Sequence, residues 1–302
     1  MINGETRLVG LIGWPVAHSL SPAMHNAAFN VLGLNWRYVP LPVPPTQIER
    51  AMRGLVAMGF RGANVTIPHK ESVRHLVDRA DRSARILGAV NTVVVSQQSA
   101  GLPLLEGYNT DSEGFVGALR WGGFEPEASA HAVVVGAGGA ARAVVAGMLA
   151  HGRGRITVLN RTLARAERLV ADLGRRPGDA ARLGAGSLFP EDLVASARTA
   201  DLLINATPVG MTPDVAQSIW PIGLPIPSHL TVCDLVYVPR PTRLLRQARA
   251  SGARTIDGLG MLVQQGTLAF RLWTHSDLAV EEIAKIMYRA CEREGERGCC
   301  DF

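Results

Sequence analysis

The sequence predicts an α/β protein built from two domains. Short apolar runs alternate with helical patterns along most of the chain, which is typical of a mostly parallel sheet covered by helices. With 302 residues the chain is long enough for two cores, and its character changes after Asp111, where a strand, a glycine turn and a small-residue helix follow. We expect one domain over 1–111 and 258–302, a second over 112–257, and a cleft between them.

In the first domain, strands are expected over 6–12, 36–43, 61–67, 90–95 and 104–108, and helices over 21–33, 46–59 and 70–87. Ser21 and Pro22 supply an N-cap and a first-turn proline. Thr46 and Glu49 have the spacing of a capping box. Pro68 is expected to start the third helical region, because proline has no N–H to lose at the first helical position.

In the second domain, strands are expected over 131–136, 156–159, 201–206 and 231–237, and helices over 140–149 and 163–173. In the latter helix Leu163, Ala166 and Leu169 share one apolar face. Segments 175–186 and 221–228 predict surface loops. Helices over 260–273 and up to about 293 close the chain, and the tail from Cys291 is expected to fray.

Composition and charge narrow the class of function. The net charge is +5 and the pI about 9.4, but the arginines are scattered and aromatic residues make up only 5%, too few for a base-stacking surface. We expect anionic small molecules rather than nucleic acid as partners. No apolar stretch approaches the ~20 residues of a membrane span, and no secretory signal is evident. The four cysteines lack metal-ligand spacing, so we expect reduced thiols, no metal and a cytoplasmic protein.

A glycine turn at 136–141 predicts a dinucleotide site. The apolar run HAVVV precedes it and a helix of small residues follows. In this context the first glycine allows a tight turn, the second lets the backbone approach a pyrophosphate, and a small third residue permits close packing of helix on strand. The helix N-terminus adds N–H groups and the positive end of a dipole. The predicted phosphate-binding residues are Gly136, Ala137, Gly138, Gly139, Ala140 and Ala141.

The cofactor is predicted to be NADP(H). NAD sites usually carry Asp or Glu about 20 residues further on, where the carboxylate accepts from the ribose 2′-OH. Here that place is taken by Asn160, Arg161 and Thr162, with Arg165 one helical turn later. Two guanidinium groups can pair with a 2′-phosphate. The alternative is that both arginines are solvated residues at a helix start.

A polar cluster also follows the strand at 61–67. It places the amide of Asn64, the hydroxyl of Thr66 and the amine of Lys70 at the end of an apolar run. Open α/β sheets hold ligands at the carboxyl ends of their strands. The segment therefore predicts a site at which Lys70 is presented to a small polar molecule.

The order of these segments resembles that of the shikimate dehydrogenase family, from residue 13 to about residue 273. The agreement of many segments in one order makes the resemblance specific. The segments are HSLSP at 18–22, NVTIPHK at 64–70, GAVNT at 88–92, GYNTD at 107–111, the glycine turn at 136–141, NRT at 160–162, NATPVGM at 205–211 and GMLVQQG at 260–266.

The resemblance implies a reversible, NADPH-dependent reduction of 3-dehydroshikimate to shikimate, in chorismate and aromatic amino acid biosynthesis. It implies an N-terminal substrate-binding domain completed by the C-terminal helices, and a Rossmann domain for NADP(H). Lys70 and Asp111 would be the catalytic pair. The implied substrate-binding residues are Ser19 and Ser21, toward the carboxylate, and Asn64, Thr66, Lys70, Asn91, Asp111, Tyr237 and Gln265. Further implied cofactor-binding residues are Asn205, Ala206, Thr207, Met211, Leu235, Gly258 and Met261.

The residue types suit this chemistry, although several points stay open. Hydride addition to a ketone develops negative charge on oxygen, which Lys70 can stabilise while it donates a proton. Asp111 either shares in the proton transfer or caps a helix that starts near Glu113. Alternative functions are a quinate or aminoshikimate dehydrogenase, with NAD as its cofactor, and a non-catalytic metabolite sensor. The sequence does not set the oligomeric state, for which a homodimer is one expectation.

Overall fold

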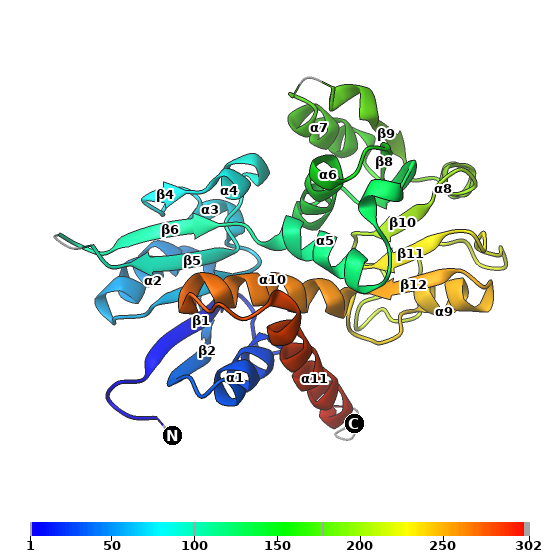
Figure 1. The fold of residues 1–302 in the computed structure, drawn as a ribbon. Helices are drawn as coiled ribbons and strands as arrows, with labels where there is room; N and C mark the ends of the chain where they lie inside the picture. The colour runs from blue at the N-terminus through cyan, green and yellow to red at the C-terminus, as the bar shows by residue number, and fades with distance from the viewer. Residues whose placement is uncertain (1, 99–100, 177, 299–302) are drawn as a thin grey trace. The chain divides into compact units, whose positions relative to one another are not determined.

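The computed structural model describes residues 2–98, 101–176 and 178–298. Contacts within the chain divide it into two compact units. Unit 1 comprises Met1–Thr110 and Val263–Phe302, and unit 2 comprises Asp111–Leu262. Each unit contains a six-stranded sheet with helices, as drawn in Figure 1. The predicted α/β class is confirmed.

Unit 1 has a mixed sheet with the strand order β2-β1-β3-β5-β6-β4. Strand β1 runs parallel to β2 and β3, whereas β5 runs antiparallel to β3 and β6. The elements are β1 (Arg7–Gly13), α1 (Ser21–Val31), β2 (Trp36–Pro42), α2 (Ile48–Ala57), β3 (Gly62–Val65), α3 (Lys70–Val73), β4 (Arg79–Ala80), α4 (Arg82–Leu87), β5 (Thr92–Ser96), β6 (Leu104–Tyr108) and α11 (Val280–Gly298). Helix α10 (Gly258–Thr274) begins in unit 2 and ends in unit 1.

Two predicted helix caps in unit 1 are wrong. Helix α1 begins at Ser21, so this serine is not its N-cap; the hydroxyl of Ser19 accepts from the Ser21 N–H at 3.2 Å. Thr46 lies in a short 3-10 turn, Pro45–Gln47, so helix α2 starts too late for a capping box. Glu49 forms an ion pair within α2 instead.

The region after Pro68, which was predicted as one helical stretch, is broken into three elements. The peptide bond before Pro68 is cis, and α3 starts at Lys70 rather than at the proline. Strand β4 then pairs with β6. Asp81 is the N-cap of α4, because its carboxylate accepts from the N–H groups of Ser83 and Ala84 at 3.2 and 2.8 Å.

Strand β2 forms one edge of the unit 1 sheet, and its outward N–H groups are either hydrogen-bonded or absent. The side-chain amide of Asn26 binds Tyr38 twice: Nδ2 donates to the Tyr38 carbonyl and Oδ1 accepts from its N–H, both at 2.9 Å. On the same edge, Trp36 donates its N–H within the preceding turn. Pro40 and Pro42, the next residues with this orientation, have no N–H.

Unit 2 has a fully parallel sheet with the order β12-β11-β10-β7-β8-β9. Counted from β7, this is the order 3-2-1-4-5-6 of doubly wound dinucleotide-binding folds. The elements are α5 (Asp111–Trp121), β7 (His131–Val135), α6 (Gly139–His151), β8 (Arg155–Asn160), α7 (Leu163–Leu173), β9 (Leu183–Ser187), α8 (Pro190–Ala197), β10 (Leu202–Asn205), β11 (Thr231–Asp234), α9 (Arg243–Ala250) and β12 (Arg254–Asp257).

The sequence missed several short elements of unit 2. The predicted loop 175–186 contains most of β9, whose glycine-rich sequence LGAGS lacks an apolar pattern but pairs with β8 along its length. Helix α8 and strand β12 were also not predicted, whereas α9 lies inside the stretch 240–254, whose sequence favours a helix. Segment 221–228 has no helix or strand, as expected.

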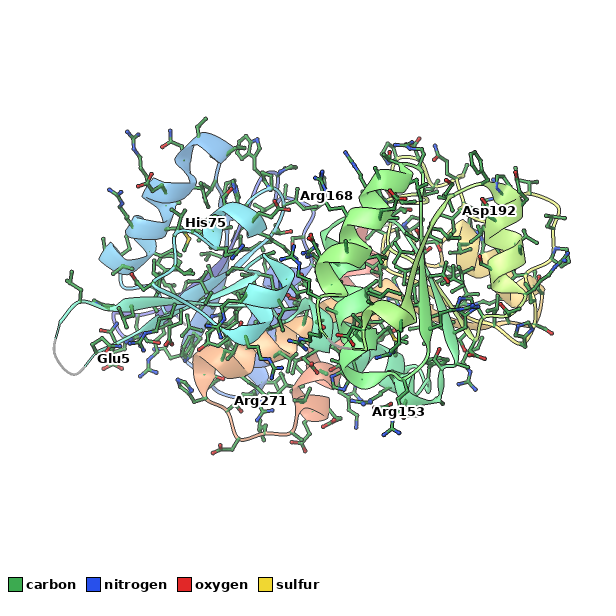
Figure 2. The ribbon with its side chains drawn as sticks, turned by 90° about the horizontal axis from the view of Figure 1, so that it is seen from above. Glu5, His75, Arg153, Arg168, Asp192 and Arg271 are labelled. Carbon is green, nitrogen blue, oxygen red and sulfur yellow. The ribbon has the colours of Figure 1, made fainter. Side chains whose placement is uncertain are left out.

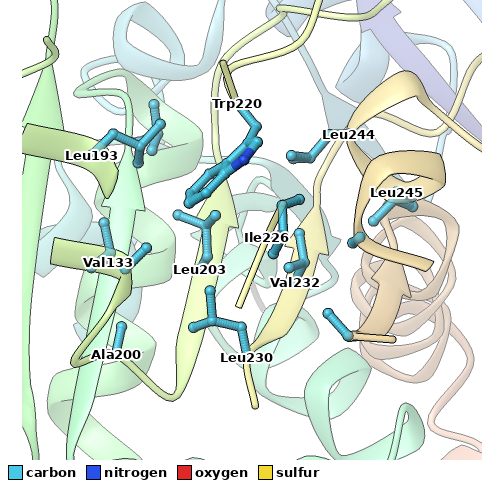
Figure 3. Close-up of a cluster of buried hydrophobic side chains, with 14 of the residues drawn as sticks. Val133, Leu193, Ala200, Leu203, Trp220, Ile226, Leu230, Val232, Leu244 and Leu245 are labelled. Carbon is cyan, nitrogen blue, oxygen red and sulfur yellow. The ribbon is translucent and has the colours of Figure 1, made fainter. Parts of the chain in front are cut away.

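One hydrophobic cluster in the core of unit 2 lies against one face of its sheet (Figure 3). Trp220 is the largest side chain in it, only 2% exposed, and its ring nitrogen donates to the carbonyl of Leu224 at 3.0 Å. Around it pack Val133 from β7, Leu203 from β10 and Val232 from β11. Figure 2 shows charged side chains such as Arg153, Arg168 and Asp192 on the outside of this unit.

The C-terminal helices complete unit 1. Helix α11 packs against α1, and the Trp273 ring nitrogen near the end of α10 donates to the carbonyl of Val93 in β5 at 2.9 Å. The prediction that the tail frays from Cys291 is wrong as far as Gly298, because α11 continues to that residue. Residues 299–302 lie outside the described residues.

No described helix has the length and apolar character to cross a membrane. The described residues also contain no cluster of three or more His, Cys, Asp or Glu suited to a metal ion.

Candidate active site and cofactor site

Three predicted substrate-binding residues meet in one hydrogen-bond network of unit 1. The Asn64 side chain, on β3, donates from Nδ2 to the carbonyl oxygen of Asn91 at 3.3 Å. The Nδ2 atom of Asn91 donates to Oε1 of Gln265, on α10, at 3.4 Å. Asn91 and Gln265 are 174 positions apart in the sequence. The fold thus brings together residues that the sequence linked only through the order of their motifs.

Two threonines hold the amide of Asn91 in one orientation. Its Oδ1 accepts from the backbone N–H of Thr110 at 2.8 Å and from the Thr92 hydroxyl at 3.0 Å. Its Nδ2 donates to the Thr110 hydroxyl at 2.9 Å. Asn91 is only 2% exposed, and leaving such a buried group without partners would be costly. Neither threonine was predicted as part of the site.

The backbone of Lys70 is tied to this network. Its carbonyl accepts from the N–H of Val90, the neighbour of Asn91, at 2.8 Å. The preceding residue, His69, is buried, and its Nε2 lies 2.7 Å from the carbonyl oxygen of Val43. A carbonyl can only accept, so this nitrogen carries the proton. His69 therefore anchors the turn that carries Lys70.

Thr66 lies against Gly13, where the backbone of β1 passes very close. A Cβ atom on Gly13 would stand 2.3 Å from Cγ2 of Thr66 and 2.8 Å from the side chain of Val16. The Thr66 N–H donates to the carbonyl of Ile12 at 2.8 Å, which fixes the threonine backbone there. Only glycine fits at position 13 without a shift.

Ser19 and Ser21 follow the carboxyl end of β1 and belong to the same unit. Ser21 is 5% exposed, while Ser19 is partly exposed. The structure thus groups in unit 1 the predicted residues Ser19, Ser21, Asn64, Thr66, Lys70, Asn91 and Gln265.

The remaining predicted substrate-binding residues, Asp111 and Tyr237, belong to unit 2. Asp111 is 8% exposed and is the first residue of α5, so the helix starts at this aspartate and not at Glu113. The positive end of a helix dipole stabilises a carboxylate at such a position. Tyr237 follows β11 and is partly exposed. The pairing of Lys70 with Asp111 stays a prediction.

The glycine turn of unit 2 fits a dinucleotide phosphate. Gly136 has φ of 114°, and a Cβ there would stand 2.9 Å from the carbonyl oxygen of Ala206. Gly138 and Gly139, at the start of the 13-residue helix α6, are exposed and have open space where a Cβ would be. A pyrophosphate can therefore approach the backbone N–H groups at this helix end.

Arg161 and Arg165 stand exposed at the end of β8 and in the first turn of α7. Neither forms an ion pair with any residue that the structure describes. By contrast, both terminal nitrogens of Arg142 lie 3.1 Å from Asp172. The two exposed guanidinium groups remain suited to a phosphate, and no acidic residue takes their place after β8.

A buried carboxylate that the sequence reasoning missed supports the neighbouring loop. Asp234, at the end of β11, is fully buried and accepts from Asn205 Nδ2 at 2.8 Å and from the Thr242 hydroxyl at 2.6 Å. Burial raises the pKa of Asp234, while these hydrogen bonds and one from the Val236 N–H oppose the rise. Oδ1 of Asn205 accepts from the hydroxyl of Thr207 at 2.6 Å. The network shapes the loop that starts at Asn205.

Other predicted cofactor residues adjoin this loop. The N–H of Leu235 donates to the carbonyl of Asn205 at 3.0 Å. A Cβ on Gly258 would stand 2.2 Å from the carbonyl oxygen of Leu235, so glycine permits the close start of α10. Met211 is 47% exposed, and Met261 lies on α10.

The missed residues differ in how far the sequence could have revealed them. Thr92 and Thr110 lie inside quoted motifs, and Asp234 is an acidic residue at the end of a buried strand, which is a usable signal. Tyr38, which donates to Oδ1 of Asn64 at 2.9 Å, lies in a strand 26 positions away and has no such signal.

Three family profiles match most of the chain. The profile of the shikimate dehydrogenase substrate binding domain matches residues 11–93, and that of shikimate / quinate 5-dehydrogenase matches residues 123–211. The profile of the shikimate 5'-dehydrogenase C-terminal domain matches residues 258–288.

Among the curated relatives, the shikimate dehydrogenase (NADP(+)) of Methanopyrus kandleri is 48% identical over 280 residues, which is 93% of this chain and 94% of that protein. The solved shikimate 5-dehydrogenase of Thermus thermophilus, in complex with NADP(H) and shikimate, has a TM-score of 0.79 and 38% identity. That match covers 94% of this chain and all of the other. The quinate dehydrogenase of Corynebacterium glutamicum, in complex with NAD, has a TM-score of 0.82, 32% identity and coverages of 94% and 99%. The chain belongs to the shikimate dehydrogenase family.

Proposed function

We propose that this chain is a shikimate dehydrogenase, an oxidoreductase that reversibly reduces 3-dehydroshikimate to shikimate with NADPH in the pathway to chorismate and aromatic amino acids. The observation that carries the proposal is the network of Asn64, Asn91 and Gln265, which assembles three amides around one polar site. The relatives that act on shikimate and share nearly the whole chain support the same activity.

The substrate matches the residue types of unit 1. Shikimate carries one carboxylate and three hydroxyls, so its site needs short donors and acceptors. We assign Ser19 and Ser21 to the carboxylate. Asn64, Thr66, Asn91 and Gln265 would bind the ring hydroxyls, with Tyr237 nearby.

Lys70 is the residue we assign to proton transfer. Bound NADPH supplies the hydride, and the ketone oxygen then gains negative charge. Lys70 stabilises this charge and donates a proton to the same oxygen, with Asp111 as its partner. Oxidation of shikimate requires Lys70 to lose its proton first.

We assign the cofactor to unit 2 and the substrate to unit 1. The backbone of Gly136–Ala141 binds the pyrophosphate, and Arg161 and Arg165 bind the 2′-phosphate, with Asn160 and Thr162 beside them. Asn205, Ala206, Thr207, Met211, Leu235, Gly258 and Met261 would line the rest of the cofactor site. The domain limits that we predict from the sequence, 1–111 with 258–302 and 112–257, stay a proposal.

The test is a kinetic comparison of shikimate and quinate, each with NADP and with NAD, on the purified protein. We expect shikimate with NADP to give the highest kcat/KM. A clear preference for quinate with NAD would refute the assignment and favour the second candidate, which the similarity to the quinate dehydrogenase supports. No turnover with any pair would favour a metabolite sensor.

We further propose a cytoplasmic location and, as one option, a homodimer. Cys233 is a buried free thiol, which suits a reducing compartment. Sedimentation of the purified protein would test the homodimer.

A further inference from the structure

The hydroxyl of Tyr38 lies directly behind the amide of Asn64. Tyr38 comes from β2 and is 2% exposed, and its hydroxyl donates to Oδ1 of Asn64 at 2.9 Å. This buried hydroxyl thus contacts a residue that we assign to the substrate.

Hydrogen bonds and ring contacts hold Tyr38 in place. Asn26 binds both of its backbone groups. The His25 ring stacks on the Tyr38 ring with centroids 4.4 Å apart and planes 5° apart, and the Trp273 ring lies 6.1 Å away at a tilt. Burial lowers the pKa of His25 to about 3, so the stacked imidazole is uncharged near neutral pH. The phenol therefore has little freedom to move.

The direction of the hydrogen bond follows from the other end of the amide. The nitrogen of Asn64 faces the carbonyl of Asn91, and a carbonyl can only accept. The NH₂ group must point there, which leaves Oδ1 toward Tyr38, so the tyrosine is the donor. Burial raises the pKa of Tyr38, and the phenol keeps the proton that it donates.

We propose that Tyr38 is a positioning residue for substrate recognition, because its hydroxyl fixes the Asn64 amide in the orientation that meets a ring hydroxyl of the substrate. This inference rests on the proposed function. A substrate hydroxyl then donates to the second lone pair of Asn64 Oδ1. Without the Tyr38 hydroxyl, Oδ1 of Asn64 loses this hydrogen-bond donor, and the substrate must bind a less ordered amide.

The first experiment replaces Tyr38 with phenylalanine, which keeps the stacked ring and removes only the hydroxyl. We expect KM for shikimate to rise about tenfold, since about 1.4 kcal/mol is typical of one buried hydrogen bond. The KM for NADP should stay within about twofold, as expected for an effect confined to the substrate. Tyr108→Phe is the matched control, because its hydroxyl donates to Glu106 in the same sheet, at 3.5 Å, and within the described residues to none that we assign to the substrate. An unchanged KM for shikimate in folded Tyr38→Phe overturns the inference.

A double-mutant cycle shows whether Tyr38 acts through Asn64. In an Asn64→Ala background, Tyr38→Phe should cause no further rise in KM for shikimate. An equal rise in both backgrounds would overturn the inference, because Tyr38 would then act by another route. If Tyr38→Phe does not fold, Asn26→Ala, which frees the backbone of Tyr38, must raise KM for shikimate, and an unchanged value counts against the proposal. Wild-type enzyme without shikimate activity would instead refute the proposed function.

Discussion

Gly13→Ala is expected to lower kcat/KM for shikimate, although the substitution neither adds nor removes a polar group. The new Cβ would stand 2.3 Å from Cγ2 of Thr66, so these atoms must separate by about 1 Å to reach ordinary contact. The backbone around Thr66 cannot yield easily, because the Thr66 N–H donates to Ile12 and the Ile67 carbonyl accepts from Trp14, at 2.8 and 3.0 Å. The Thr66 side chain must therefore rotate, and its hydroxyl moves with the methyl group.

A displacement of about 1 Å at a substrate-binding group can cost up to ~10²-fold in rate. We expect kcat/KM for shikimate to fall by about 10- to 100-fold in Gly13→Ala, which corresponds to about 1.4–2.7 kcal/mol at the transition state. The KM for NADP should not change. Overpacking should also lower the free energy of unfolding by about 1–3 kcal/mol, measured by urea denaturation.

Gly54→Ala is the matched control for this change. It adds the same methyl group in α2 of the same unit, where the nearest atom is the end of the flexible Met58 side chain at 3.5 Å. Its kinetics should equal those of the wild type. Folded Gly13→Ala with wild-type kcat/KM for shikimate would refute the argument that Gly13 sets the position of Thr66.

Three further predictions concern the proton donor, the cofactor and pH. Lys70→Ala should lower kcat by a factor of about 10² or more, and wild-type turnover would exclude Lys70 as the proton donor. Arg161→Ala should raise KM for NADP far more than KM for NAD, and equal changes would mean that this arginine does not read the 2′-phosphate. Burial lowers the pKa of His25 from 6.5 to about 3, so the unfolded chain binds a proton that the folded one does not. Stability should therefore fall as the pH drops below 6.5, by about 1.4 kcal/mol at pH 5.5. His25→Phe should show less of this loss in urea denaturation at pH 7.5 and 5.5, and an equal loss would assign it to other groups.

The sequence predicted the elements of this fold best where hydrophobic pattern and glycine turn agreed. The strand before Gly136 and the helix after it lie where expected, because both signals are local. Strand β9 was missed because its glycines carry no apolar pattern, and its pairing with β8 decides its structure. The caps at Ser21 and Thr46 failed for a similar reason: spacing alone cannot show that a neighbouring turn already occupies the position.

The candidate site also contains residues that the sequence could reveal and one that it could not. Motif order pointed to Asn64, Asn91 and Gln265, and the structure then brought their amides together. Tyr38 could not be found in this way, because its importance lies in one hydrogen bond from β2 to β3, two strands that are separated by β1 in the sheet. A residue that positions a substrate-binding side chain can be identified only when the structure shows where that side chain lies.

The lack of free outward N–H groups on β2 has a consequence for self-association. An exposed edge strand normally offers its free N–H groups as a template for another chain, which leads to sheet extension or aggregation. On this edge Asn26 takes the N–H of Tyr38, and Pro40 and Pro42 have none to offer. A second copy that docked here would find acceptors without donors. If the protein forms a homodimer, we expect its interface to use packed side chains elsewhere and not a continuous sheet through β2.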